Sequence, residues 1–390
     1  MAGTIKPRDA RELRQAVEWA LNDGVTLDVR GQGSKLALGK PMRCDQALDL
    51  SGLSGVVDYA PEELVVTLRA GTALNEVETL LAQRNQMLAF EPPDLGPLLG
   101  LEAGQGTLVG AVMGNFAGSR RVSAGAARDH LLGFSGVNGR GEAFKSGGKV
   151  MKNVTGYDLS KLLAGSWGTL AVLDEVSVKV LPAPDQTRTL LLLGLTDDAA
   201  VKAMCAAMGS PHDVSGAAHV GDRTALRIEG VAPSVEARLK VLRDLLRGSS
   251  AKMEELGTLE SRAFWREVRD VAPLKAPGDA VVWKISCPPA EGPAVVVRIK
   301  AKRPAVEAFY DWSGGLIWLA LPASADADHE IVRRAVVPAG GHATLIRAPE
   351  AVRAAVPVFQ PQPPPLAALA NRVKESFDPR RLFNPGRMGQ

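Results

Sequence analysis

A glycine-dense segment at residues 104–118 is the feature that most constrains the fold of this 390-residue chain. Its sequence, GQGTLVGAVMGNFAG, places small apolar residues between five glycines. Glycine lets the backbone pass close to other atoms, so the segment predicts loops and short strands around a large planar or phosphorylated ligand. A set of ordinary β-turns is the alternative interpretation.

A second glycine loop, Gly-Gln-Gly-Ser at residues 31–34, follows a predicted strand at residues 25–30. Successive backbone N–H groups in such a loop can form a nest for phosphate or pyrophosphate. The loop does not match the dinucleotide-binding fingerprint, because position 36 is Leu and no helix is expected to follow, and it lacks the Gly-Lys-Ser/Thr of a Walker A loop. An ordinary tight turn is the alternative.

Composition excludes several classes of protein. Apolar residues make up 46% of the chain and charged residues 23%, as in an ordinary folded protein, which argues against wholesale disorder. A net charge of +3 is too small to indicate a nucleic-acid partner. The longest apolar runs, such as residues 190–195, are far below the ~20 residues that cross a bilayer, so no transmembrane segment is expected.

The cysteines and the N-terminus indicate where the protein works. Cys44, Cys205 and Cys287 are far apart and form no CxxC, so the chain is expected to hold neither an iron–sulfur cluster nor a metal of its own. The first residues contain no apolar core of a signal peptide. We therefore expect a cytoplasmic protein, with peripheral attachment at the inner membrane through a partner left open.

Turn residues and periodicity predict three parts. The prolines at 182 and 184 end a first domain, residues 1–182, which opens with a helix at residues 9–23 capped by Asp9 and Gly24. The pattern of residues 183–350 predicts two successive repeats of strands and helices. In the first repeat, strands are expected at 189–195 and 217–228. This pattern predicts a ferredoxin-like α+β layer, an antiparallel sheet with helices on one side. Residues 351–390 form a proline-rich linker and a last helix.

Three arginines follow the glycine-dense segment. Arg120, Arg121 and Arg128 could hold the carboxylate of a substrate by paired hydrogen bonds. Equally, they could pair with acidic neighbours such as Asp129 and serve structure or an interface.

Three segments in this order resemble the FAD-binding domain of the vanillyl-alcohol oxidase/PCMH flavoprotein superfamily. They are VRGQGS at residues 29–34, GTLVGAVMGN at 106–115 and GSWGTLAV at 165–172. Further segments at 87–93, 118–121, 128–129, 150–158 and 383–388 are similar to the FAD-binding subunits of bacterial glycolate oxidase (glycolate dehydrogenase) complexes. The resemblance covers residues 1–182 and the C-terminal tail closely, and the middle of the chain in outline.

The resemblance implies an α+β protein with a two-subdomain PCMH-type FAD-binding domain and a ferredoxin-like second domain. The second domain would cover the substrate or form an interface, and residues 351–390 would pack back on the FAD domain. The family's covalent members attach flavin through His in the first loop or Cys in a later one. This chain has Lys35 and no cysteine at those places, so non-covalent FAD is expected.

The resemblance also assigns residues to the cofactor. Asn153 and Asp158 would orient the turn at the ring system, or would cap the helix that begins at Asp158. The full set expected to bind FAD is Arg30, Gly31, Gln32, Gly33, Ser34, Lys35, Thr107, Gly110, Asn115, Gly118, Asn153, Asp158, Gly168, Thr169 and Val172.

The function implied is that of an FAD-binding subunit that helps oxidise glycolate, or a similar small 2-hydroxy acid, to glyoxylate. Electrons would pass through a second flavin subunit and an iron–sulfur subunit. Catalytic relatives carry a Glu-His-Gly element that this chain lacks, so its catalytic residues are unknown. His130 is a weak candidate for the base, with a packing or surface role as the alternative. A non-catalytic structural flavin subunit and a stand-alone oxidase of another substrate remain alternatives.

Overall fold

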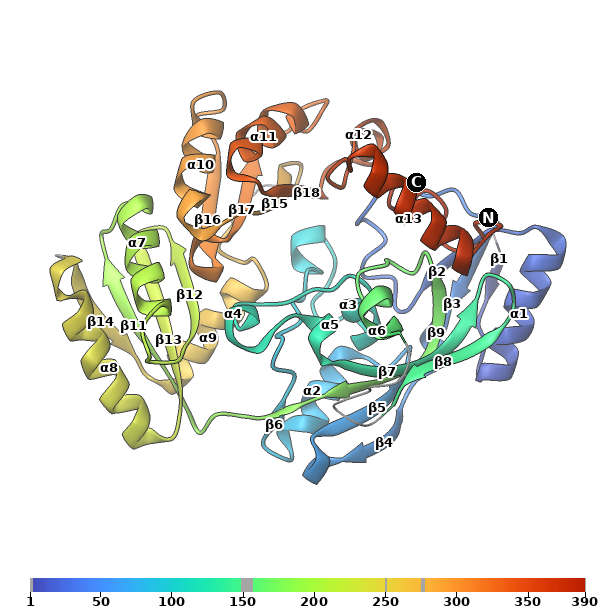
Figure 1. The fold of residues 1–390 in the computed structure, drawn as a ribbon, viewed down its shortest axis with the longest axis horizontal. Coiled ribbons are helices and arrows are strands. Elements are labelled where there is room, and N and C mark those ends of the chain that lie inside the picture. The colour runs from blue at the N-terminus through green and yellow to red at the C-terminus, as the bar shows by residue number, and fades with distance from the viewer. Residues whose placement is uncertain (1–2, 149–156, 250, 275–277, 390) are drawn as a thin grey trace. The chain divides into compact units, whose positions relative to one another are not determined.

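The computed structural model describes residues 3–148, 157–249, 251–274 and 278–389, and they form two compact units (Figure 1). Unit 1 comprises residues 1–116, 125–183 and 361–390, and unit 2 comprises residues 117–124 and 184–360. Two short segments therefore belong to a different unit from their sequence neighbours. Residues 117–124 belong to unit 2, whereas the C-terminal residues 361–390 belong to unit 1.

Unit 1 contains two sheets. A parallel sheet has the order β1-β3-β2, and a larger antiparallel sheet has the order β4-β5-β9-β7-β8. The strands of the first are β1 (Gly3–Ile5), β2 (Leu27–Arg30) and β3 (Gln46–Asp49). Those of the second are β4 (Val56–Ala60), β5 (Val65–Arg69), β7 (Leu131–Asn138), β8 (Ala143–Gly147) and β9 (Ala171–Lys179). A separate short pair joins β6 (Gln86–Met87) and β10 (Leu181–Pro182).

The helices of unit 1 are short and begin at identifiable caps. Helix α1 (Ala10–Asp23) confirms the predicted first helix, because the Asp9 side chain accepts from Glu12 N and Gly24 ends the helix with φ 68°. The other helices are α2 (Leu74–Ala82), α3 (Leu108–Met113), α5 (Ala127–His130), α6 (Leu159–Leu163) and α13 (Pro364–Phe377). A buried apolar core that includes Leu13, Leu48, Leu68 and Val176 joins these helices to both sheets.

Unit 2 is a duplicated ferredoxin-like fold. The first βαββαβ repeat comprises β11 (Gln186–Leu193), α7 (Asp197–Met208), β12 (Val214–Val220), β13 (Arg223–Gly230), α8 (Ala232–Leu246) and β14 (Lys252–Leu256). The second comprises β15 (Val281–Ser286), α10 (Gly292–Lys300), β16 (Glu307–Asp311), β17 (Leu316–Leu321), α11 (His329–Val336) and β18 (His342–Arg347). This arrangement confirms the ferredoxin-like layer predicted from the two repeats of the sequence pattern.

One antiparallel sheet runs through both repeats. Its order is β14-β11-β13-β12-β16-β17-β15-β18, so the second repeat mirrors the first. The repeats meet where β12 pairs with β16 at His219 and Tyr310. The unit also contains the helices α4 (Arg121–Ala124), α9 (Thr258–Arg269) and α12 (Glu350–Ala355).

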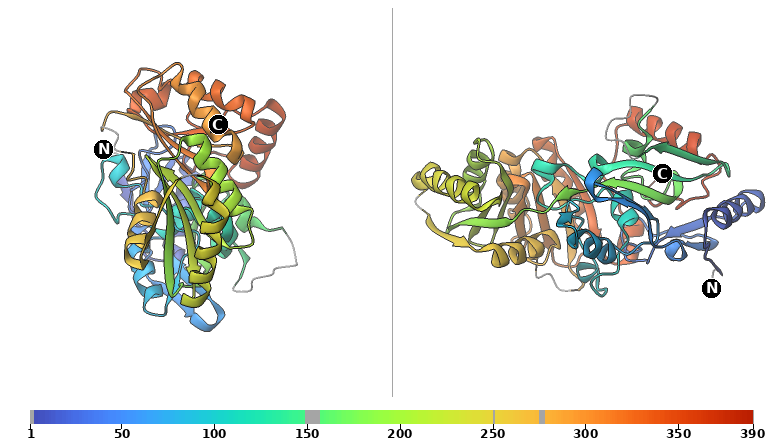
Figure 2. Two further views of the ribbon diagram at one scale, coloured as in Figure 1. Left: turned by 90° about the vertical axis from the view of Figure 1, so that its left-hand side faces the viewer. Right: turned by 90° about the horizontal axis from the view of Figure 1, so that it is seen from below.

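Two details of unit 2 differ from the sequence-based expectation. The single strand expected at residues 217–228 is a hairpin, because Gly221, with φ 62°, turns the chain between β12 and β13. The helices do not lie on one side alone. Leu190 of β11 packs into the core with α7 and α8, whereas its neighbour Thr189 accepts a hydrogen bond from Trp265 of α9 on the other face (Figure 2, left).

A buried ion pair anchors the C-terminal helix in unit 1. The Lys374 ammonium lies 2.6 Å from Asp378 and also donates to the carbonyl oxygens of Thr169 and Phe383. Asp378 in turn accepts from the backbone N–H groups of Leu382 and Phe383. Both side chains are almost fully buried, at 4% and 0% exposure, and burial lowers the pKa of Lys374.

We expect Lys374→Met to destabilise the protein by about 3–5 kcal/mol, because it leaves the buried Asp378 carboxylate without its cation. Chemical denaturation monitored by circular dichroism measures the change. The matched control is Arg14→Met, which breaks the solvent-exposed Arg14–Glu18 pair in the same unit and should cost less than about 1 kcal/mol. Equal losses from the two variants would contradict this role for Lys374.

Candidate FAD site

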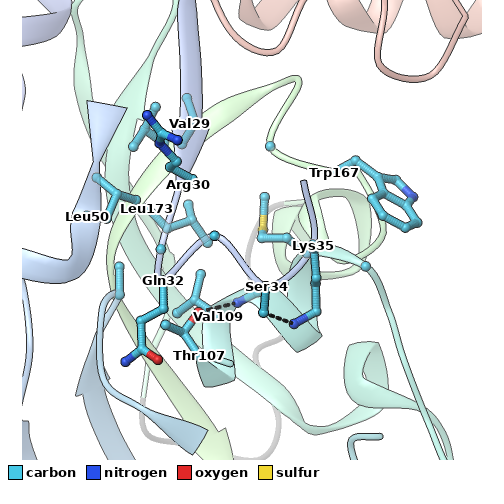
Figure 3. A pocket seen from close by; sticks show the side chains of 18 of the residues that line it. Val29, Arg30, Gln32, Ser34, Lys35, Leu50, Thr107, Val109, Trp167 and Leu173 are labelled. Carbon is cyan, nitrogen blue, oxygen red and sulfur yellow. Dashed lines mark hydrogen bonds between the residues drawn. The ribbon is translucent and has the colours of Figure 1, made fainter. Parts of the chain in front are cut away.

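A pocket opens in unit 1, where the glycine loops lie close together (Figure 3). The pocket is bounded by the loop after β2, the first turn of α3, the start of β9 and one residue of the tail. Its lining residues are Val29, Arg30, Gly31, Gln32, Gly33, Ser34, Lys35, Leu36, Leu50, Ala70, Thr107, Val109, Gly110, Met113, Gly114, Trp167, Gly168, Ala171, Val172, Leu173 and Arg387.

The loop after β2 requires glycine at two positions. Gly33 has φ 79°, a left-handed conformation that residues with side chains rarely adopt. A Cβ atom at Gly31 would lie 2.9 Å from the Thr107 methyl group, too close for any side chain. The two glycine segments, far apart in sequence, therefore touch at Gly31 and Thr107.

Thr107 also organises the second segment. Its hydroxyl accepts a hydrogen bond of 3.0 Å from Gly110 N and caps α3. A Cβ atom at Gly110 would lie 3.0 Å from this hydroxyl and 3.5 Å from the Lys35 ammonium. Glycine at position 110 thus leaves room for the charged end of Lys35 against the backbone of the second segment.

Among the described residues, three cationic side chains line this pocket: Arg30, Lys35 and Arg387. The Lys35 ammonium lies 3.4 Å from the Ser34 hydroxyl, and the Lys35 carbonyl oxygen accepts from the Arg387 guanidinium at 2.7 Å. Burial, opposed by Asp94 and reinforced by the Arg387 charge, lowers the pKa of Lys35 to about 8. A diphosphate, which carries two negative charges, fits such a pocket because it would offset the repulsion between Lys35 and Arg387.

The tail that supplies Arg387 is fixed by Asn384. Its side-chain oxygen accepts from Val29 N at 2.8 Å, and its amide nitrogen donates to the carbonyl oxygen of Trp167 at 2.8 Å. The Arg387 guanidinium then lies 5.6 Å from the centre of the Trp167 ring, a cation–π distance. The tail thereby connects the β2 loop with the Trp167 turn.

The structure gathers ten of the residues predicted to bind FAD around this pocket. They are Arg30, Gly31, Gln32, Gly33, Ser34, Lys35, Thr107, Gly110, Gly168 and Val172. Asn153 lies outside the described residues.

Four other predicted FAD residues are not among those lining the pocket. The Thr169 hydroxyl donates to Ser166 O, and Asn115 accepts from Arg128 N. Asp158 accepts from Lys161 N and caps α6, which was the alternative role considered for it. The carbonyl oxygen of Gly118 accepts from the Trp312 indole in unit 2.

His130 has the environment of a packing residue. Its side chain is buried, its ring lies 5.3 Å from that of Phe90, and its Nδ1 is 3.3 Å from the Lys179 carbonyl oxygen. These contacts favour the structural interpretation of His130 over the catalytic one.

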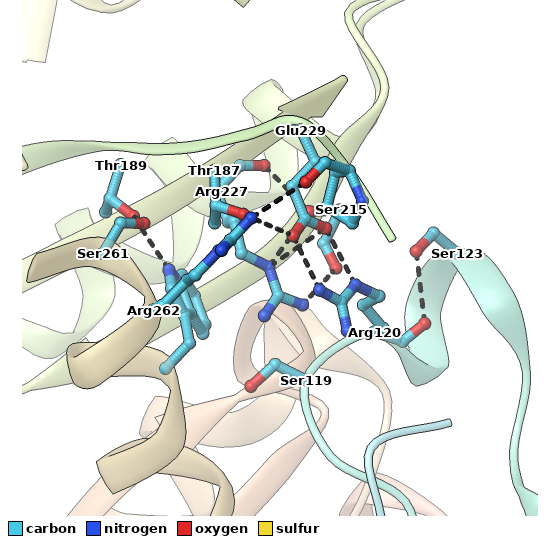
Figure 4. A network of polar contacts seen from close by, with 12 residues as sticks. Ser119, Arg120, Ser123, Thr187, Thr189, Ser215, Arg227, Glu229, Ser261 and Arg262 are labelled. Atoms are coloured by element: carbon cyan, nitrogen blue, oxygen red, sulfur yellow. Dashed lines mark hydrogen bonds and ion pairs between the residues drawn. The ribbon is translucent and has the colours of Figure 1, made fainter. Parts of the chain in front are cut away.

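The three arginines occupy different environments. Arg128 is exposed in α5 of unit 1. Arg120 makes a two-point contact with Glu229, with N–O distances of 2.8 and 2.6 Å (Figure 4). Burial raises the pKa of the Glu229 carboxyl, but the charges of Arg227 and Arg120 outweigh it and hold the pKa at about 2. This contact favours the structural alternative for Arg120. Arg121 lies against Trp312.

Sequence reasoning missed Trp167 and Arg387 as pocket residues. Both lie within segments quoted for the family resemblance, GSWGTLAV and the 383–388 tail, so the segments were found but not these side chains. The apolar lining residues such as Val109, Met113 and Leu173 carried no signal in the sequence beyond their hydrophobicity.

Comparisons with known proteins agree with this geometry. The FAD binding domain family matches residues 1–147. The fold is similar to that of p-cresol methylhydroxylase, with a TM-score of 0.75 over 99% of this chain and 88% of that one, at 12% identity. The fold and the pocket define a PCMH-type FAD-binding protein.

The sequence is 35% identical to glycolate oxidase subunit GlcE of Escherichia coli over 381 residues, which are 97% of either chain. It is 30% identical to glycolate oxidase subunit GlcD of Bacillus subtilis over 51% of this chain and 41% of that one. The chain belongs to the family of FAD-binding glycolate oxidase subunits. It is a flavin-dependent oxidoreductase, its cofactor is FAD, and non-covalent attachment stays a prediction.

None of the helices in the described residues is long and apolar enough to cross a membrane. No group of three or more His, Cys, Asp or Glu side chains in the same residues is placed to hold a metal ion.

Replacing Arg120 with Met should lower the free energy of unfolding by about 3 kcal/mol near neutral pH, because Glu229 would lose a buried cation. Glu229 has a folded pKa of about 2 against 4.5 for an ordinary carboxyl, so its stabilising contribution is complete above pH 4.5 and is lost toward pH 2. The difference between variant and wild type should therefore shrink over that window. Denaturant unfolding from pH 7 to pH 2 measures it. Arg128→Met, at the exposed arginine, is the control and should change little.

FAD affinity should fall as the pH rises above about 8, because Lys35 then loses the charge that faces the cofactor's diphosphate. The Kd for FAD, measured by flavin fluorescence quenching between pH 6.5 and 9.5, should rise by up to about tenfold per pH unit above that point. Lys35→Met should bind FAD more weakly at pH 7 and show a flatter profile. Lys145→Met, at an exposed lysine of β8 in the same unit, should keep the wild-type profile. An unchanged profile in Lys35→Met would remove Lys35 from the diphosphate site.

Proposed function

We propose that this protein is the FAD-binding subunit of a multi-subunit glycolate oxidase that oxidises glycolate, or a related small 2-hydroxy acid, to the 2-oxo acid. The similarity that supports this most strongly is 35% identity to the Escherichia coli subunit over 97% of both chains. A similarity that spans both units supports a shared role for the whole chain rather than a shared cofactor domain alone.

Within this proposal the pocket residues divide the work of holding FAD. The backbone of residues 31–34 and the charges of Lys35 and Arg387 bind the diphosphate. Gly168 and Val172, with the Trp167 ring, bind the flavin or adenosine side. Bound FAD supplies a two-electron acceptor for the alcohol, and the protein holds and orients it.

Onward electron transfer requires partners. Cys44, Cys205 and Cys287 are free thiols at separate places, so this chain lacks the cysteine set of an iron–sulfur cluster. We propose a second flavin subunit and an iron–sulfur subunit as those partners. We place the complex in the cytoplasm, with any attachment to the inner membrane made through the partners.

A non-catalytic flavin subunit is the second candidate. The environment of His130, buried against Phe90, favours it, because the histidine within the flavin-domain segments then has a packing role and not a catalytic one. In that case the partner flavin subunit would carry the chemistry, and this chain would bind FAD and stabilise the complex.

Anaerobic reduction of the bound flavin tests both candidates. The purified chain is loaded with FAD and mixed with glycolate, and absorbance near the flavin band is followed with and without the co-expressed partner subunits. Bleaching of this chain's flavin supports a catalytic subunit. Bleaching only of the partner's flavin, distinguished by a Gly31→Val variant that clashes with Thr107 and empties this chain's pocket, supports the second candidate. No bleaching by any small 2-hydroxy acid in the assembled complex would contradict the proposed function.

A further inference from the structure

Asn384 of the C-terminal tail contacts three residues that line the cofactor pocket. Its side-chain oxygen accepts a hydrogen bond from Val29 N, and its side-chain nitrogen donates to the carbonyl oxygen of Trp167, both at 2.8 Å. A Cβ atom at Gly168 would lie 2.8 Å from the same side-chain nitrogen. Val29 and Trp167 lie on different parts of the pocket wall (Figure 3). The two ends of one amide group therefore join two parts of that wall.

The backbone conformation at position 384 also favours asparagine. Its φ is 43°, in the left-handed region, where asparagine is found far more often than most residues with a side chain. The Trp167 backbone is left-handed too, with φ 56°, a conformation that an aromatic residue keeps only where the surrounding structure maintains it. The hydrogen bond from Asn384 goes to the carbonyl oxygen of this strained residue, so it helps to hold the Trp167 turn in place.

Other contacts fix the tail without the Asn384 side chain. Leu27 N donates to Leu382 O at 2.8 Å, and Asn384 N donates to Leu27 O at 3.0 Å. Lys374 and Asp378 form their buried ion pair earlier in the tail. The tail can therefore pack on unit 1 without the side-chain amide, whose bonds instead set the exact position of the residues that follow.

Arg387, three residues after Asn384, reaches the pocket. Its guanidinium donates to the Lys35 carbonyl oxygen at 2.7 Å and lies 5.6 Å from the centre of the Trp167 ring. Arg387 N donates to Asn384 O at 3.2 Å, and Arg387 O accepts from Lys40 N at 3.0 Å. The turn that begins at Asn384 thus determines where the Arg387 side chain lies.

The Arg387 charge acts on the Lys35 ammonium. Burial is the main cause that lowers the pKa of Lys35 to about 8, the Arg387 charge adds to it, and Asp94 opposes it. Arg30 also lines the pocket and lies 3.8 Å from Asp28. Because Arg387 and Lys35 carry the same charge, an anion that lies against both would reduce their repulsion.

We propose that Asn384 is a positioning residue of the FAD site, which holds Arg387 beside Lys35 so that the two cations bind the diphosphate together. The inference rests on the proposed placement of the diphosphate at Lys35 and Arg387, and not on the identity of the substrate. Held in this place, Arg387 also influences the pH at which Lys35 loses its charge. Asn384 therefore affects the pH range over which FAD stays bound.

The Kd of the full chain for FAD, measured by flavin fluorescence quenching between pH 6.5 and 9.5, tests this role. Asn384→Gly permits the left-handed backbone and removes both side-chain hydrogen bonds. It should raise the Kd at pH 7 by about fivefold, and Arg387→Met should raise it by about tenfold. In both variants the loss of affinity at alkaline pH should begin at a higher pH than in the wild type, because the Arg387 charge no longer acts on Lys35.

Matched controls place the same substitutions elsewhere in unit 1. Asn85 is exposed, has φ 51° and is not among the residues that line the pocket, so Asn85→Gly should keep the wild-type Kd and pH profile. Arg380 of the tail is exposed and donates to Leu21 O, so Arg380→Met should do the same. Thermal unfolding of each FAD-free variant checks that weaker binding does not reflect a lost fold.

A shared response of Asn384→Gly and Arg387→Met, in both Kd and pH profile, would support the positioning role. Unchanged binding in Asn384→Gly beside weaker binding in Arg387→Met would overturn it. Weaker binding in Asn384→Gly with the wild-type pH profile would also overturn it, because the effect would not pass through Arg387. Unchanged binding in Arg387→Met would remove Arg387 from the diphosphate site, and the proposed oxidation of glycolate would stand or fail independently.

Discussion

The side-chain amide of Asn384 is the contact on which the cofactor pocket depends. It bonds to Val29 and to Trp167, which are 355 and 217 positions away in the sequence. These bonds hold the loop after β2, the Trp167 turn and the C-terminal tail as one wall, and they place the Arg387 charge in the lining. A pocket built from loops needs such cross-links, because loops have little secondary structure to position them.

Buried ion pairs also anchor chain segments in both units. Lys374 and Asp378 anchor the tail in unit 1, and Arg120 and Glu229 anchor residues 117–124 in unit 2. In each case a short segment belongs to a different unit from the residues that precede it in the sequence. A buried ion pair holds the segment there, and either charge would cost free energy if it were buried without its partner. The segment 117–124 is the clearer example, because it directly follows the glycine-dense segment that lines the pocket of the other unit.

The two units are built in different ways. Unit 1 lines its pocket with glycine backbone and with the cations Arg30, Lys35 and Arg387, which suits a large phosphorylated cofactor. Unit 2 repeats a βαββαβ motif around one continuous sheet. Strand alternation is what places Lys284 on one face of that sheet while Trp283 enters the core on the other.

The sequence by itself determined the fold class, the caps of α1, the two repeats of the ferredoxin-like unit and most of the loop residues that line the pocket. These features are local, since a capping side chain, a repeating pattern or a glycine loop is visible within a few neighbouring residues. Only the tertiary structure decided that Arg120 is bound to Glu229, that His130 packs on Phe90 and that Arg387 reaches the pocket. Those outcomes depend on partners about 40 to 350 positions away, and a charge or an imidazole takes its role from the groups it meets after folding.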